Sequence, residues 1–516
     1  MKVLSKRVIG MVLAGAMAVG ALSGCGGANE TASSGEEVGY WVALDTLVSQ
    51  SVNNFGETPI GKALSEKTGV NVKWIHPAQG QSGEKFNLMV ASNDLPDIVE
   101  YNWIDYAGGP DAAIEQGLII DLNDYRDQLP NFFAAIESDE EIEKLVKTDT
   151  GKIFGFPMLQ KDPSLGSTGG FIIRQDWLDD LGLEKPETID EWENVLTQFK
   201  DKKGATAPLS CPYPFFRSGR LTGAFGINGD YYRDGDTVKF GPYESAFKTY
   251  LERMNSWYTK GLLDKNFATI DKATADANML NGVSGVTFGG LGGGIGMFMQ
   301  SKPNDTFAVS GLKHITQVKG EKPEYGFTSL PVTWGAVAAV SAKSKNIEQA
   351  LKLLDFGYSE EGKMLYNFGI EGESYEMVDG YPKYTEKITN NPDGLAMANA
   401  LALYARSNYA GPFEQDRRYL EQYASSEVQQ QAWADWADSN ATEHNMPFVY
   451  VSQEDADEMA QYNTAITTYV DEMVVKFITG QESFDNYDTF VKELESRGIK
   501  RVLEIKQAAY DRYKNR

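Results

Sequence analysis

The stretch VNVKWIHPAQGQSGEKFNLMVASNDLPDIVEY, residues 70–101, contains the pattern that decides the fold. Residues 70–75 alternate apolar and polar side chains, which is typical of a strand with one buried face. Phe86 to Ala91 has a helical pattern, and Asp94-Leu95-Pro96 separates it from a second strand at Asp97–Tyr101. Strands separated by helical stretches predict βαβ units and a parallel sheet.

The same alternation continues on both sides of this stretch. Residues 60–67 form a helical pattern that ends at Thr68-Gly69, and residues 171–173 form a strand followed by a helix over 175–181. Thr188 and Glu191 form a capping box, Thr-x-x-Glu, at the start of a further helix. Later patterns predict strands over 283–288 and 334–341 and helices over 347–356, 459–479, 484–497 and from about 501.

The N-terminus has the form of an export signal. Lys2, Lys6 and Arg7 precede an uncharged segment, residues 8–21, of fourteen residues. At 1.5 Å per residue that segment spans about 21 Å, less than the roughly 30 Å core of a bilayer. It is followed by Leu22-Ser23-Gly24-Cys25, which resembles a bacterial lipobox.

We therefore predict a signal peptide over residues 1–24, a lipidated (palmitate-bearing) Cys25 and a flexible tether over 25–37. The alternative is a chance cysteine after an ordinary signal peptide. Only one other cysteine, Cys211, is present, so lipidation of Cys25 leaves the mature chain without an internal disulfide.

Charge and length limit the function. The chain has 516 residues and a net charge of −25, and loss of the three positive charges in residues 1–24 brings the mature chain to −28. Such a charge repels nucleic acid and anionic membrane surfaces at long range. The mature chain is long enough for two lobes with separate cores, and no second apolar stretch reaches 18 residues.

A search for catalytic and cofactor motifs finds none. The three histidines, His76, His314 and His444, are far apart, and there is no nucleophile elbow or phosphate-binding loop. The run Gly289–Gly294 departs from the dinucleotide fingerprint at Ile295, which leaves a ligand-approaching loop or a tight turn as its two interpretations. With 73 acidic residues, a glycosidase carboxylate pair cannot be argued from sequence. The sequence therefore predicts neither a metal site, nor a cofactor, nor an enzyme.

Aromatic residues stand in polar, non-periodic segments that suit carbohydrate binding. Trp41 lies near Asp45, residues 101–106 read Tyr-Asn-Trp-Ile-Asp-Tyr, and Trp334 follows Pro331. Aromatic faces pack on the C–H faces of sugars, and a few placed polar groups bind the hydroxyls. The competing interpretation is that each of these rings belongs to the core.

Taken in order along the chain, several stretches resemble the extracellular solute-binding proteins of family 1, in particular the large lipoproteins of carbohydrate ABC importers in Gram-positive bacteria. The stretches are Leu95–Ile98, Gly117–Leu122, Gly151–Pro157, Arg174–Gly182, Pro186–Trp192 and Gly369–Tyr375. The resemblance implies an α/β, two-lobe periplasmic-binding-protein-like fold with a central ligand cleft and a hinge, extended by C-terminal helices. The first lobe would comprise residues 38–160 plus 328–375, and the second 161–327 plus 376–516.

The resemblance also implies the function and the partners. We expect a lipid-anchored, monomeric protein at the extracellular face of the cell membrane that captures a small solute, an oligosaccharide by its aromatic content, for the membrane subunits of an importer. Loop placement and chemistry, not the resemblance, suggest the ligand-binding residues: Trp41, Asp45, Trp103, Asp105, Tyr106, Arg217, Arg220, Phe288 and Trp334.

Two other functions compete with this one. A surface-anchored glycoside hydrolase or lyase would share the export signal and the aromatic residues, and would need a pair of carboxylates in one cleft. A surface adhesin or scaffold would show a flat exposed apolar patch instead of an enclosed cleft.

Overall fold

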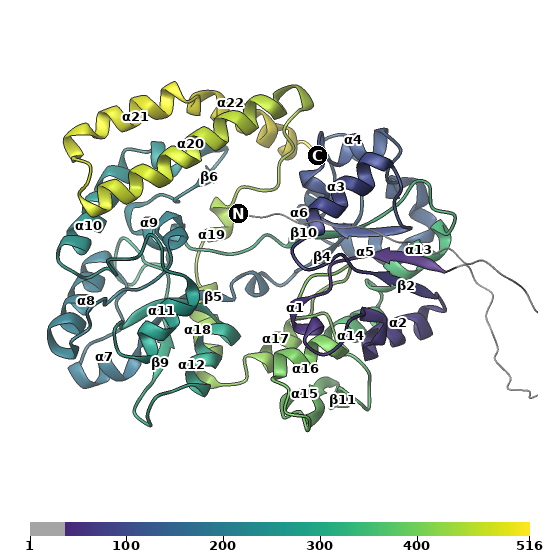
Figure 1. Ribbon diagram of the computed structural model, residues 1–516, viewed down its shortest axis with the longest axis horizontal. Coiled ribbons are helices and arrows are strands. Elements are labelled where there is room, and N and C mark those ends of the chain that lie inside the picture. The colour runs from purple at the N-terminus through teal and green to yellow at the C-terminus, as the bar shows by residue number, and fades with distance from the viewer. Residues whose placement is uncertain (1–36) are drawn as a thin grey trace, which may run out of the picture. The chain divides into compact units, whose positions relative to one another are not determined.

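The computed structural model describes residues 37–516 (Figure 1). The signal peptide predicted over 1–24, Cys25 and the tether up to residue 36 lie outside the described residues, as does the side chain of Trp334. None of the helices within residues 37–516 combines the length and the apolar character that a membrane span needs.

The first sheet has five strands in the order β2-β1-β3-β10-β4. Their bounds are β1 Val38–Trp41, β2 Val72–Ile75, β3 Ile98–Tyr101, β4 Phe156–Leu159 and β10 Val332–Val340. β1 is parallel to both β2 and β3, with Tyr40 opposite Ile98, as the βαβ pattern predicts. β10 arrives from more than 150 residues further along the chain and runs antiparallel to β3 and β4.

Helices that connect the strands pack on this sheet, and the sequence defines their ends well. α2 (Pro59–Thr68) begins after the cap Thr58 and ends at Gly69, whose φ of 67° favours glycine. The other helices of this part are α1 Thr46–Ser49, α3 Ser82–Ser92, α4 Gly109–Glu115, α5 Pro130–Glu137, α6 Glu140–Val146, α13 Ile347–Phe356 and α14 Glu360–Phe368. In Figure 1 most of them surround the first sheet.

The second sheet is antiparallel, which corrects the parallel arrangement that the strand-helix alternation predicts for this part of the chain. β5 (Gly169–Arg174) lies between β8 (Val286–Gly290) and β9 (Val309–Gly311) and pairs antiparallel with both. More than a hundred residues connect β5 to β8, and because these two strands are antiparallel the connection is not the right-handed crossover of a βαβ unit. Periodicity along the sequence reports strand and helix but not strand direction.

Around the second sheet the predicted helix ends are largely confirmed. α7 (Gln175–Leu181) ends at Gly182, and α8 (Ile189–Lys203) begins with the predicted capping box of Thr188 and Glu191. The other elements of this part are α9 Gly219–Thr222, β6 Tyr231–Asp234, β7 Thr237–Phe240, α10 Ala246–Thr259, α11 Lys272–Leu280 and α12 Met297–Gln300.

The glycine run takes neither of its two predicted forms. Residues 291–296 form one turn of π-helix that leads into α12. A Cβ on Gly294 would stand 2.8 Å from the side chain of Ile172 and 2.9 Å from the backbone of Gly289, so close packing requires glycine here. The run is therefore a packed helical turn rather than a flexible loop.

The C-terminal third is mostly helical. The hairpin β11 (Tyr375–Val378) and β12 (Tyr381–Tyr384) is followed by α15 Glu386–Thr389, α16 Met397–Tyr404, α17 Arg417–Tyr423, α18 Glu427–Ala437 and α19 Ala441–His444. The chain ends with α20 Gln453–Thr479, α21 Tyr487–Ser496 and α22 Ile499–Lys514. Figure 1 shows α20 and α22 side by side, with α21 joining them.

The hydrophobic core forms one cluster on the first sheet and two on the second. α22 contributes to clusters on both: Val502 packs with the second sheet, whereas Tyr510 and Tyr513 pack with the first. Arg516 then binds Asp149, between α6 and β4, at 2.6 Å. The last helix thus ties the two sheets together.

A buried ion pair joins the first sheet to the C-terminal third. Glu100 of β3 accepts two hydrogen bonds from Arg406, at 2.6 and 3.1 Å, and a third from the hydroxyl of Tyr40 at 2.6 Å. Burial alone would lower the pKa of Arg406, but the adjacent Glu100 carboxylate raises it above its usual value. Both side chains are at most 4% exposed, so the loss of either partner leaves the other charge buried alone.

We predict that Arg406→Met lowers the free energy of unfolding by about 3–5 kcal/mol, because Glu100 then remains charged and unpaired in the core. Urea unfolding of the wild type and the variant measures the loss. Lys67→Met, which breaks the exposed pair with Glu361, is the control and should cost less than about 1 kcal/mol. Equal, small losses in the two variants would contradict the prediction.

Candidate functional site

An aromatic cluster stands where β1 and β3 end. The ring of Tyr101 lies 4.4 Å from Phe86 and 5.9 Å from Trp41, and Phe86 lies 5.0 Å from Trp103, measured between centroids. Ligands in α/β folds sit beyond the carboxyl ends of parallel strands, which is where this cluster is placed. Tyr101, the half-buried member, is an aromatic that the sequence-based selection missed.

The two predicted tryptophans of this cluster are core residues. Trp103 has no exposed surface and donates its indole N–H to the carbonyl of Val99 at 3.0 Å. Trp41 is 3% exposed. In this conformation both rings are packed in the core, and their contact with a ligand stays a prediction.

The polar residues predicted nearby have local partners. Asp45 caps α1 through the N–H of Leu47 at 2.8 Å. The exposed Asp105 accepts a hydrogen bond from Asn102 at 2.8 Å, and Tyr106 donates its hydroxyl to Gln116 at 2.7 Å. The structure therefore brings these residues to the same end of the sheet without joining them in one network.

Near the second sheet, Arg217 is already paired. Its guanidinium binds Asp471 of α20 at 2.5 Å, and the Tyr213 hydroxyl donates to the same carboxylate at 2.8 Å. Burial works to lower the pKa of Arg217, but the hydrogen bond that it donates to Asp471 and the nearby charges of Asp230 and Asp471 together raise the pKa above its usual value. This contact anchors the segment of Arg217 to α20.

Arg220, three residues later, lies in a stack of aromatic rings. Its guanidinium is 4.0 Å from the centroid of Phe327 and 4.6 Å from that of Phe288, so the two rings cover its faces. Phe288 stacks in turn on Phe215, with centroids 3.8 Å apart. Arg220 itself is 6% exposed, Phe215 and Phe288 are half-buried, and Phe327 is 45% exposed. The predicted residues Arg220 and Phe288 are thus brought together.

Within residues 37–516, Arg220 has no acidic side chain within ion-pair distance and no hydrogen-bond partner, and its Nε is fully buried. Burial lowers its pKa to about 9, so the group stays charged at neutral pH. His314 is also fully buried, and burial together with the charge of Arg220 lowers the histidine pKa to about 3. The neutral histidine gives the arginine no counter-charge.

Sequence reasoning missed Phe215 and Phe327. Phe215 belongs to Tyr213-Pro214-Phe215-Phe216-Arg217, where a dense aromatic run next to an arginine is the available signal. Phe327 lies in the irregular segment between β9 and β10 and has no periodic context. Its position over Arg220 depends on a tertiary contact that no local pattern encodes.

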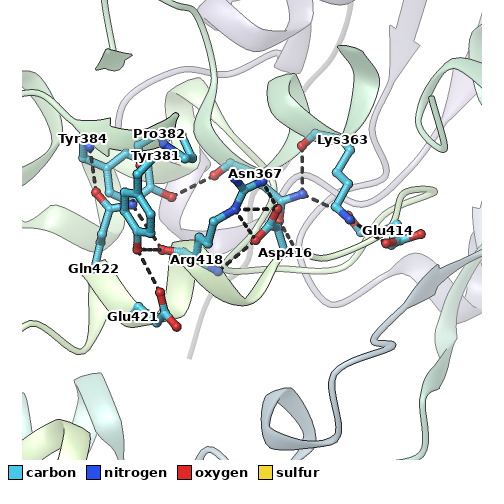
Figure 2. Close-up of polar contacts among 10 residues, drawn as sticks. All are labelled: Lys363, Asn367, Tyr381, Pro382, Tyr384, Glu414, Asp416, Arg418, Glu421 and Gln422. Atoms are coloured by element: carbon cyan, nitrogen blue, oxygen red, sulfur yellow. Dashed lines mark hydrogen bonds and ion pairs between the residues drawn. The ribbon is translucent and has the colours of Figure 1, made fainter. Parts of the chain in front are cut away.

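A second polar cluster is fully paired and serves the fold. Asn367 donates to the carbonyls of Lys363 and Glu414 and accepts from the N–H of Asp416, and Asp416 binds Arg418 at 2.6 Å (Figure 2). Figure 2 also shows Gln422 linking α17 to the β11–β12 hairpin. These contacts tie α14, α17 and the β11–β12 hairpin together.

Two further features bear on binding. A cavity of 290 Å³ lies between the segments that pass from one sheet to the other; its lining includes Gln160, Lys161, Ser329, Pro331 and Asn445. Across the described part of the chain, no group of three or more His, Cys, Asp or Glu side chains is placed to hold a metal ion.

Comparisons with known proteins agree on one family. The model of the bacterial extracellular solute-binding proteins matches residues 55–364. The fructooligosaccharide ABC transporter substrate-binding protein FusA of Streptococcus pneumoniae is 25% identical, over 89% of this chain and 87% of its own. The polygalacturonan/rhamnogalacturonan-binding protein YtcQ of Bacillus subtilis is 22% identical, over 98% of this chain and 99% of its own.

The fold is shared with solved structures. The alginate-binding protein AlgQ2, in a crystal structure without calcium ion, is 25% identical, with 92% of this chain and 97% of that chain covered and a TM-score of 0.71. The predicted fold class, a two-lobe α/β fold extended by C-terminal helices, is thereby confirmed.

We predict that His314 stays neutral between pH 8 and pH 5, because burial and the charge of Arg220 hold its pKa at about 3. In the unfolded chain the histidine protonates near pH 6.5, so its contribution to stability is present above that pH and falls as the solution is acidified. An NMR titration of the imidazole resonances across this pH range tests the prediction. The chain has only three histidines, so the resonances can be resolved individually. A His314 midpoint near 6.5 would contradict the prediction. Arg220→Gln should raise the midpoint.

Proposed function

Because this chain belongs to the bacterial extracellular solute-binding proteins, we propose that it is the substrate-binding component of an ABC importer and that it captures an oligosaccharide. The family was expected from the sequence, and the family model, which covers more than half of the chain, confirms it. Relatives named for fructooligosaccharide and for polygalacturonan support the ligand class.

The observation that carries the proposal is the stack of Arg220 with Phe288, Phe215 and the exposed Phe327. Rings of this kind pack on the C–H faces of sugars, and a guanidinium donates in-plane hydrogen bonds to sugar oxygens. A surface that joins apolar rings to one placed polar group is typical of sites that bind small molecules.

We infer that Asp45, Asp105, Tyr106, Arg217 and Trp334 of β10 belong to the same binding region, together with Tyr101. Hinge closure would bring the ends of β1 and β3 toward the Arg220 stack. The lobes would comprise residues 38–160 plus 328–375 and residues 161–327 plus 376–516. Phe413 and the end of α22 are exceptions within the second range: they pack on the first core, so we assign these two segments to the first lobe.

We further propose that the protein acts at the extracellular face of the membrane, held by a lipid on Cys25, as a monomer and without catalysis. The Leu-Ser-Gly-Cys sequence after an apolar segment supports the anchor. The similarity to a substrate-binding protein of an ABC transporter supports a non-enzymatic role. Membrane subunits of an importer would recognise the closed form.

The experiment that tests capture is a thermal-shift screen of residues 26–516 against neutral and acidic oligosaccharides, monosaccharides, peptides and polyamines. A ligand that binds only the folded state adds about 2.7 kcal/mol of stability at a hundredfold excess over its Kd. We expect the melting midpoint to rise with one class of oligosaccharide, which is recovered intact. A cleaved product would instead support the hydrolase, and a response confined to peptides or polyamines would contradict the ligand class.

For the anchor, we predict that Cys25→Ser releases the protein from the membrane, because acylation needs the thiol and the tether offers no other apolar attachment. Fractionation of cells that express the wild type and the variant measures it. Cys211→Ser, at a buried cysteine, is the matched control and should stay in the membrane fraction. Membrane retention of Cys25→Ser would contradict the prediction.

A further inference from the structure

Three arginines are buried within residues 37–516, namely Arg174, Arg220 and Arg406. Arg406 binds the carboxylate of Glu100, and Arg174 binds that of Asp176 through two hydrogen bonds of 2.8 and 2.6 Å. Arg220, as buried as Arg174, has no such partner among the described residues. A buried charge is stable only when it is paired, so Arg220 is the exception that needs an explanation.

Arg174 is a second buried arginine that stacks on aromatic rings, and it also binds a carboxylate. Its guanidinium lies 4.4 Å from the ring of Trp177 and 4.4 Å from that of Phe307, so aromatic rings cover it as they cover Arg220. With its faces covered, the guanidinium binds in its own plane, and there it holds Asp176 with the two-pronged geometry that matches a carboxylate. At Arg220 the rings are present and the carboxylate is missing.

We propose that the ligand is an acidic oligosaccharide and that the carboxylate of one hexuronate unit completes the Arg220 stack. This inference rests on the proposed function and names the chemical class of its ligand. The exposed ring of Phe327 would pack on the apolar face of the same sugar, and the in-plane N–H groups of Arg220 would donate to its carboxylate.

The charge balance favours a single carboxylate. One guanidinium neutralises one negative charge, and the neutral His314 beside it adds none. The rest of the chain is strongly acidic, with a net charge of −25, so a dianionic phosphate would keep an uncompensated charge in a negative protein. The names of the relatives cover different carbohydrates and do not decide between acidic and neutral ligands.

The test compares oligomers that differ only in the carboxylate. Isothermal titration calorimetry on residues 26–516 measures the affinity for six trimers. These are the trimers of galacturonate, mannuronate and glucuronate and the carboxyl-reduced counterpart of each. We expect at least one acidic trimer to bind about 30-fold or more tightly than its reduced counterpart, since a desolvated arginine–carboxylate pair is strong.

Arg220→Gln should remove this difference in affinity between the acidic and the reduced trimer. Arg220→Lys should keep part of the difference, because lysine retains the positive charge but cannot form the bidentate contact with a carboxylate.

Controls separate this effect from a loss of structure. Arg497→Gln removes another arginine that stacks on a ring, Tyr469, but one that already has an acidic partner, Glu493; its ligand preference should stay that of the wild type. Circular dichroism and the melting midpoint show whether the Arg220 variants fold. Phe327→Ala keeps the arginine and should weaken the binding of both trimers, because it removes the sugar-packing ring; the acidic trimer should lose more, because the variant also exposes the guanidinium to water.

The outcomes also separate this inference from the proposed function. If neutral oligosaccharides bind the wild type as tightly as acidic ones and Arg220→Gln leaves the preference unchanged, the inference is wrong and oligosaccharide capture stands. Preference for a sulfated trimer over every uronate would overturn the carboxylate assignment. Binding of neither acidic nor neutral oligosaccharides would contradict both.

Discussion

The bidentate pair between Glu100 and Arg406 is the contact on which the assembly of this chain depends. Glu100 lies in β3 among core residues, and Arg406 comes from a segment 306 residues later. A charge at either position is costly unless the other is present, so the first core is complete only when the C-terminal third has docked on it. The hydroxyl of Tyr40 and the rings of Phe55 and Tyr409 surround the pair and fix its geometry. Together with the last helix, this contact explains why the two sheets behave as one compact unit over residues 37–516.

The sequence predicts the local structure much better than the topology. Capping boxes and C-terminal glycines are chemical signals contained within four or five residues, and for this reason the predicted end of α7 at Gly182 and the predicted start of α8 at its capping box match the structure. Strand direction is set by which distant segment arrives beside a strand, so the alternation around β5 suggests a parallel sheet where the structure has an antiparallel one. The start of α20, six residues earlier than its apolar pattern indicates, reflects the cap Ser452, which lies in a polar segment without periodicity.

The site illustrates the same limit. The sequence signal for a carbohydrate-binding surface is an aromatic residue in polar surroundings. Both Trp103, which is fully buried, and Tyr101, which lies two residues earlier and is half-buried, carry this signal. Burial is decided by the neighbours Phe86 and Val99, which a single sequence does not place. The arginines carry a clearer lesson, because Arg217 and Arg220 look equivalent in sequence. Arg217 has Asp471 as its partner and Arg220 has no acidic partner among residues 37–516, and only the structure separates the paired arginine from the unpaired one.

The position of the free arginine also bears on how binding and closure are linked. Arg220 and Phe288 belong to the part of the chain built on the second sheet, whereas Phe327 lies in the segment that runs from β9 back to β10 of the first sheet. If the ligand binds at this stack as proposed, it would contact the segment that links the two sheets and that would move during closure. A ligand stabilises the closed state only through contacts that differ between the open and closed forms. Because Phe327 is exposed and sits directly on the guanidinium, its contact with a ligand is the one most able to differ between the two forms. Under the proposed closure, recognition of the sugar and the change of conformation would depend on the same few side chains.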